Sequence, residues 1–212
     1  MVDGISNLNN MQLDVLREIG NVGSGNAATA LAKLLNRKVD MEVPIAKILE
    51  FKEVSETLGG AELPVVGILL GMSGDLTGNI MFILHENEAE MLVKMIMKGL
   101  LGYEAQHDSG CSFNEIELSA LKEIGNILAG SYLTALSTLT NLKIFPTTPD
   151  VAIDMAGAIL SVPAIEFGKV GDTVLYIETE FIDGNDSVMG DFFLVPDYDT
   201  YDVLLKALGV VE

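Results

Sequence analysis

Residues 13–44 read LDVLREIGNVGSGNAATALAKLLNRKVDMEVP, and residues 118–149 read LSALKEIGNILAGSYLTALSTLTNLKIFPTTP. The two stretches align without a gap, each residue of the first falling on the residue 105 positions later. A match of this length indicates an internal duplication. Later segments also correspond, with Gly78 over Gly190. The matched positions that matter below are Asp14 with Ser119, Glu18 with Glu123, Asn21 with Asn126, Gly25 with Gly130, and Pro44 with Pro149.

Apolar periodicity predicts helices and strands in the same order in both halves. The polar residues of 102–112 are typical of a linker, and residues 155–167 stay undecided because Pro163 interrupts a helix there. A break is possible at the glycines in the middle of the first helix, and each motif proline suits the first position of a strand. The predicted helices are 10–35, 86–101 and 198–208, and the predicted strands are 43–49, 65–71, 78–85, 150–154, 173–181 and 187–195.

We therefore expect an α/β fold made of two similar halves about a pseudo-twofold axis, with the motif helices flanking a mainly antiparallel sheet. The whole of 1–212 is expected to form one domain: half one over 1–101, the linker over 102–112, and half two over 113–212. Because the duplication lies within a single chain, we expect a monomer.

Composition narrows the classes of function. The chain has 12 Lys and Arg against 31 Asp and Glu, a formal net charge of −19. Nucleic-acid binders neutralise phosphates with clustered cations, so nucleic acid is not an expected partner. The apolar runs are far shorter than the roughly 20 residues that span a bilayer, and no secretory signal is recognisable, so membrane insertion is not expected either. The lone Cys111 cannot form an internal disulfide, which favours the cytoplasm.

A narrow polar stripe runs along each repeated helix. At about 100° per residue, Glu18, Asn21 and Gly25 all fall within about 40° of Asp14 on a helical wheel, and an apolar face lies opposite. An Asn side chain offers a donor and an acceptor without titrating, so it can hold a water molecule. A Glu one turn away can pair with a partner's Lys, and a Gly lets a partner's backbone approach closely.

Other interpretations of these residues stay open at this point. A polar helix face is most often only solvated, and Gly is often a packing or capping residue, although repetition of the same types weakens that view. Residues 23–28 fit G-x-G-x-x-A, but a helix precedes them where a dinucleotide site needs a strand. Cys111 is interpreted as a small linker residue. Asp14 and Glu18 could ligate a hard cation, but the second repeat has Ser119 in place of Asp14. His85 and His107 lack ligand spacing, so we expect no metal bound by this chain itself.

The patterns Asp14-x3-Glu18-x2-Asn21-x22-Pro44 and Ser119-x3-Glu123-x2-Asn126-x22-Pro149 resemble the paired motif of the CheC, CheX and FliY phosphatase family. The resemblance covers nearly the whole chain and is closest to the CheC type. It implies a chemotaxis enzyme, an aspartyl-phosphate phosphatase that dephosphorylates the response regulator CheY.

The same resemblance assigns the roles. Glu18, Asn21, Glu123 and Asn126 would be catalytic, with Asn orienting the attacking water and Glu docking the partner. Asp14, Ser119, Gly25, Gly130, Pro44 and Pro149 would support the motif. The deamidase CheD would be a second partner, and Mg²⁺ would be brought by the regulator, with no cofactor of the chain's own. The alternative is a weakly catalytic or non-catalytic module that only docks CheY-like and CheD-like partners.

Overall fold

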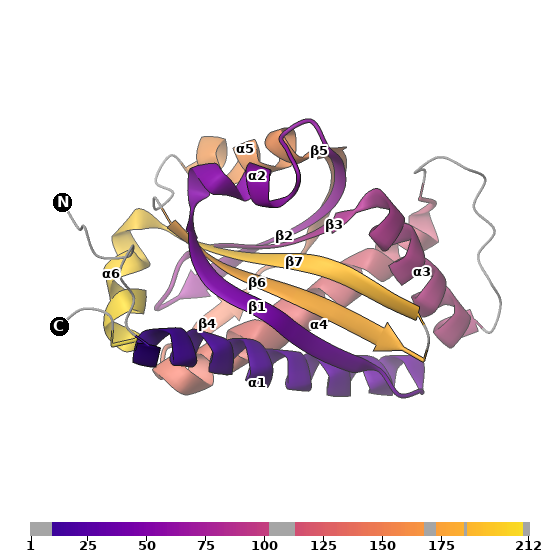
Figure 1. Cartoon of the computed structure of the whole chain (residues 1–212), viewed down its shortest axis with the longest axis horizontal. Coiled ribbons are helices and arrows are strands. Elements are labelled where there is room, and N and C mark those ends of the chain that lie inside the picture. The colour runs from indigo at the N-terminus through magenta and orange to yellow at the C-terminus, as the bar shows by residue number, and fades with distance from the viewer. Residues whose placement is uncertain (1–9, 102–112, 168–172, 185, 210–212) are drawn as a thin grey trace.

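The structure is a computed structural model that describes residues 10–101, 113–167, 173–184 and 186–209. Within these ranges a seven-stranded sheet carries helices on both faces (Figure 1). The elements follow the chain as α1 (Asn10–Leu35), β1 (Asp40–Glu50), η1 (Phe51–Glu53), α2 (Val54–Thr57), β2 (Pro64–Gly74), β3 (Gly78–His85), α3 (Glu86–Leu101), α4 (Glu115–Thr140), β4 (Ile144–Pro146), β5 (Asp150–Met155), α5 (Ala156–Phe167), β6 (Thr173–Asp183), β7 (Asp186–Pro196) and α6 (Tyr198–Ala207).

The sheet order is symmetric about its central pair of strands. β3 pairs with β7, and outward from them β3 is followed by β2 and β5, while β7 is followed by β6 and β1. All of these pairs are antiparallel. When β1, β2 and β3 are matched with β5, β6 and β7, the order reads the same from either side, as a pseudo-twofold axis requires. The predicted α/β fold with a mainly antiparallel sheet is confirmed.

The outer strands are exchanged between the two repeats. β1 pairs with β6, which comes more than a hundred residues later, and β5 pairs back with β2. Each outer strand therefore satisfies its backbone hydrogen bonds on a strand of the other repeat. Neither repeat contains the partners for its own outer strand, so the two repeats depend on each other for their sheet structure.

Two hydrophobic cores lie on opposite faces of the sheet. α1 and α4 run next to each other beneath one face, where the larger core contains Phe82 stacked on Phe192 with ring centroids 4.6 Å apart (Figure 1). α2 and α5 cover the other face over a smaller core that includes Leu58, Ile159 and Phe193. Because β3 is covered on both sides, its residues are buried from Gly78 to Leu84. No described helix is long and apolar enough to cross a membrane.

The prediction that a strand begins at Pro44 is wrong. β1 begins at Asp40, and its pairing with β6 shifts register between Glu42 and Ile45, the interval that contains Pro44. β1 is an outer strand of the sheet. Outer strands and irregular pairings are where a residue without a backbone N–H is tolerated inside a sheet, so proline at this position interrupts the strand without ending it.

Pro149 marks the same interruption in the second repeat, where the outer strand is fully divided. β4 ends before it and β5, the predicted strand, begins directly after it, and both pair with β2. Thr147 spans the gap, since its backbone N–H and its hydroxyl Oγ1 each lie 2.8 Å from backbone atoms of Gly71. β4 itself was not predicted, because three residues are too few to show a periodicity.

Two other sequence predictions needed the structure to settle them. α1 continues unbroken through its glycine-rich middle, and residues 156–167 form the helix α5 in spite of Pro163. Between β6 and β7, Gly184 has φ +66°, a conformation that favours glycine. The predicted linker with Cys111 lies outside the described residues.

Candidate functional site

The segment Glu-Ile-Gly-Asn occurs in both motif helices and alternates between solvent and core. Ile19 and Ile124 are each 1% exposed, so they anchor α1 and α4 in the larger core. The following glycines, Gly20 and Gly125, are also buried. A Cβ at Gly125 would lie 2.5 Å from the Cγ2 atom of Ile68, so glycine is what lets α4 approach the sheet this closely. The Ile-Gly pair thus fixes the orientation of each helix.

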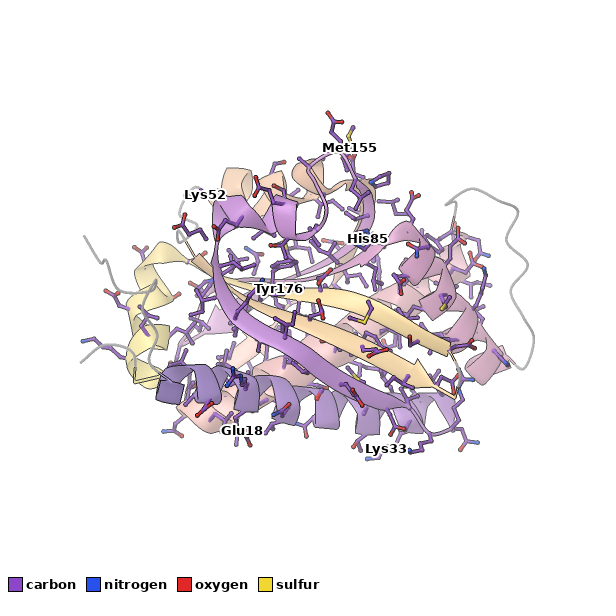
Figure 2. The ribbon with its side chains drawn as sticks, in the orientation of Figure 1. Glu18, Lys33, Lys52, His85, Met155 and Tyr176 are labelled. Carbon is purple, nitrogen blue, oxygen red and sulfur yellow. The ribbon has the colours of Figure 1, made fainter. Side chains whose placement is uncertain are left out.

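The residues on either side of that buried pair face solvent. On α1 and α4 in turn, the exposed members of the two stripes are Asp14, Glu18 and Asn21, and Ser119, Glu123 and Asn126. Figure 2 places Glu18 on the side of α1 away from the sheet. In the part of the chain that the structure describes, the side chains of both Glu-Asn pairs make no hydrogen bond or ion pair. Each stripe therefore presents an amide and a carboxylate, one helical turn apart, on a rigid helix.

Within the described ranges the stripe glycines have no packing role against other elements. A Cβ at Gly25 or at Gly130 would meet no other atom within 4 Å. The contrast is Gly23, where a Cβ would lie 2.3 Å from the Cδ1 atom of Tyr132, so that glycine is needed for α1 to pack against α4. Open space above Gly25 and Gly130 leaves the helix backbone accessible on the exposed stripe.

Tyr132 holds the contact between the two motif helices in place. Its hydroxyl shares a hydrogen bond with the Oγ1 atom of Thr179 on β6 at 2.9 Å, and its ring lies 4.6 Å from that of Phe192. Burial raises the pKa of Tyr132 to about 12, so the hydroxyl stays protonated at neutral pH. The bond ties α4 to the sheet directly beneath the crossing with α1.

The first position of the stripe differs between the two repeats. The Asp14 carboxylate lies 3.1 Å from the Arg17 guanidinium, and both side chains are more than 60% exposed. Such exposed pairs contribute only about 0.2–1 kcal/mol. Ser119 stands in the place of Asp14 and carries no charge, and Lys122 stands in the place of Arg17. These two cations were not among the predicted site residues, although the repeat itself places one directly before each motif glutamate.

The predicted residues fall into three structural classes. The four Glu and Asn side chains with Asp14 and Ser119 are brought together on two exposed stripes, and the two stripe glycines leave the backbone open beside them. Pro44 lies instead on the outer strand β1, and Pro149 lies in the gap between β4 and β5. Among the described residues no group of three or more His, Cys, Asp or Glu side chains is placed to hold a metal ion.

Comparison with known proteins places this arrangement in a family. The CheC-like family pattern matches residues 11–48 and 116–153, ranges that contain every predicted site residue. The CheY-P phosphatase CheC of Bacillus subtilis is 44% identical over 200 residues, which span 93% of this chain and 94% of that protein. The chain belongs to the CheC-like family.

Other relatives of this CheC-like chain agree with the fold. The flagellar motor switch phosphatase FliY of Bacillus subtilis is 29% identical over 149 residues, covering 70% of this chain and 37% of that protein. The crystal structure of Thermotoga maritima FliY superposes with a TM-score of 0.71 at 23% identity, covering 95% of this chain and 98% of that one. The crystal structure of the FliM middle domain from H. pylori superposes with a TM-score of 0.68 at 15% identity, covering 94% of this chain and 99% of that one. At these identities the two structures support the fold alone.

Proposed function

We propose that the protein hydrolyses the phospho-aspartyl group of a CheY-type response regulator at two sites, one on each motif helix. The observation that carries the proposal is the pair of exposed Glu-Asn sets at equal spacing, held outward by the buried Ile-Gly between them. The 44% identity to a protein named as a CheY-P phosphatase supports the same substrate class.

The chemistry asks little of the enzyme beyond placing water. A water oxygen attacks phosphorus, the bond between phosphorus and the aspartyl oxygen breaks, and inorganic phosphate and a free carboxylate result. The acyl phosphate is already reactive, so positioning the nucleophile in line is the main contribution left. Asn21 and Asn126 can each accept a hydrogen bond from that water and donate another to it or to the phosphoryl group.

The neighbouring residues bring the regulator into register. Glu18 and Glu123, exposed and without partners in the described structure, would each accept a hydrogen bond from a lysine of the regulator. Open space above Gly25 and Gly130 would allow the regulator's backbone to come close to the helix. Mg²⁺ would be held by the regulator itself.

Three further features belong to the same proposal. The chain acts as a cytoplasmic monomer of 22.7 kDa. It functions in chemotaxis. A CheD-type deamidase is its second protein partner.

The test is phosphate release from a phosphorylated CheY-type regulator by the wild type, Asn21→Ala, Asn126→Ala and the double variant. Each single variant should keep the activity of the other site. The double variant should lose about 10²-fold, equivalent to about 2.7 kcal/mol, while its circular dichroism stays unchanged because both side chains are exposed. Asn26→Ala is the matched control, since Asn26 is exposed on α1 but lies off the stripe.

Two outcomes would contradict the proposal. A folded double variant with full activity would remove the water-positioning role of the asparagines. A wild-type protein that binds the regulator without accelerating phosphate release would leave only a docking module.

A further inference from the structure

A basic residue stands directly before the motif glutamate in both repeats. Arg17 and Lys122 are both exposed. Each lies four residues before the stripe asparagine, Asn21 or Asn126, and residues four apart on a helix are surface neighbours with Cβ atoms about 5–6 Å apart. Each proposed water-holding amide therefore has a cation on the adjacent turn.

The two cations differ in what neutralises them. Arg17 forms its ion pair with Asp14 at 3.1 Å. At the corresponding position Ser119 has no charge, and within the described ranges Lys122 forms no ion pair. At the first site Asp14, Arg17 and Glu18 carry a net charge of −1. At the second site Ser119, Lys122 and Glu123 are neutral together, so the first site has one more negative charge.

Other carboxylates of α4 do not replace the missing aspartate. Glu117 is buried, and its side chain accepts the backbone N–H of Asn114 at 2.8 Å, which closes the N-terminus of the helix. Glu115 is exposed but stands seven residues before Lys122, about 10 Å along the helix axis. Lys122 therefore has no carboxylate among its helical neighbours three or four residues away.

A local positive charge matters because this chain carries a net charge of −19. The proposed substrate presents a phosphoryl group and its aspartyl surroundings, so it is anionic where it meets the stripe. We propose that Lys122 attracts and orients this anionic surface at the second site, and that Asp14 cancels the same effect of Arg17 at the first. The inference rests on the proposed function, and it makes the second site the faster one at low ionic strength.

The sites are separated by removing one asparagine at a time. Asn21→Ala leaves the second site and Asn126→Ala leaves the first. For each, kcat/KM for phosphate release is measured from 0.01 to 1 M ionic strength, over which the Debye length falls from about 30 to about 3 Å. The second site should be faster at low salt and lose its advantage at high salt. In the Asn21→Ala protein, where only the second site works, Lys122→Gln should lower the low-salt rate about two- to five-fold, the range for one exposed charge interaction. Lys122→Arg should restore the rate.

Exchanging the first stripe residue tests the asymmetry directly. Asp14→Ser in the first-site background should raise the low-salt rate and introduce a salt dependence, because Arg17 is then no longer neutralised. Ser119→Asp in the Asn21→Ala protein should lower the low-salt rate and weaken its salt dependence, because Lys122 is then neutralised. Lys33→Gln is the matched control: Lys33 is an exposed cation at the other end of α1 from Glu18 (Figure 2), and its loss changes the net charge by the same amount.

The outcomes of the two proposals are distinct. If the wild type releases no phosphate, the proposed function fails. If the separated sites are active but share one salt profile that Asp14→Ser, Ser119→Asp and Lys122→Gln leave unchanged, the function stands and this inference is refuted. An effect of Lys33→Gln as large as that of Lys122→Gln would also refute it, since net charge alone would then account for the rates.

Discussion

Alanine in place of Gly25 separates the stability of the motif helix from its contact with a partner. A Cβ at this position would meet no described atom within 4 Å beyond its own stretch of helix, and the same holds for Gly130. Glycine inside a helix is less favourable than alanine by about 0.5–1 kcal/mol, so each substitution should raise the free energy of unfolding by that amount. The two residues lie on different helices, so the effects should add. Each 1 kcal/mol should raise Tm by about 2–4 °C in a chain of this length.

Gly23→Ala is the matched control two residues away, and its effect should have the opposite sign. The new Cβ would lie 2.3 Å from Cδ1 and 2.8 Å from Cε1 of Tyr132. That ring cannot move freely, because its hydroxyl shares a hydrogen bond with Thr179 and the ring lies tilted against Phe192, with centroids 4.6 Å apart. Overpacking of this kind costs about 1–3 kcal/mol, which exceeds the gain in helix propensity.

Urea unfolding of Gly25→Ala, Gly130→Ala, the double variant and Gly23→Ala measures these free energies, and phosphate release is assayed on the same proteins. The Gly25→Ala, Gly130→Ala double variant should be more stable than the wild type. If the regulator's backbone approaches the stripe closely, this variant should also be less active. A Gly25→Ala protein that is clearly destabilised, or a Gly23→Ala protein that is as stable as the wild type, would refute the packing argument. A stabilised double variant with full activity would remove only the close approach of the partner.

Three more predictions concern binding, pH and assembly. Replacing Glu18 and Glu123 together by alanine should weaken regulator affinity as well as lower the rate, and titration calorimetry showing unchanged affinity would contradict the docking role. Burial raises the pKa of Asp191, although the Tyr176 hydroxyl donates to its Oδ1 atom at 2.7 Å. Stability from this residue is therefore present below the unfolded pKa of about 3.9 and is lost as pH rises through the folded value. In the Asp191→Asn variant, the free energy of unfolding measured with urea should therefore fall less between pH 4 and pH 7 than in the wild type. Light scattering should give the 22.7 kDa mass of one chain, and twice that mass would exclude the monomer.

Local structure was largely predictable because its causes are local. The helix at 86–101 and the strand at 78–85 have the predicted bounds, since apolar period and flanking turn residues decide them. Pro44 was misplaced because a strand interior normally excludes proline, and only the neighbouring pairing shows that it stands at an irregularity of an outer strand. Residues 156–167 stayed undecided for a related reason: Pro163 argued against a helix that tertiary packing on β2 and β5 supports.

The sequence by itself determined the two stripes, because the 3.6-residue period of a helix orders its side chains without reference to anything else in the fold. It also determined their duplication and the difference between Asp14 and Ser119. Only the tertiary structure decided that the outer strands are exchanged between the repeats, since strand pairing depends on which edges meet in space. The same holds for the glycines of α1. Gly23 and Gly25 look alike in the sequence, and what distinguishes them is the ring of Tyr132, brought from 109 residues away against one and not the other.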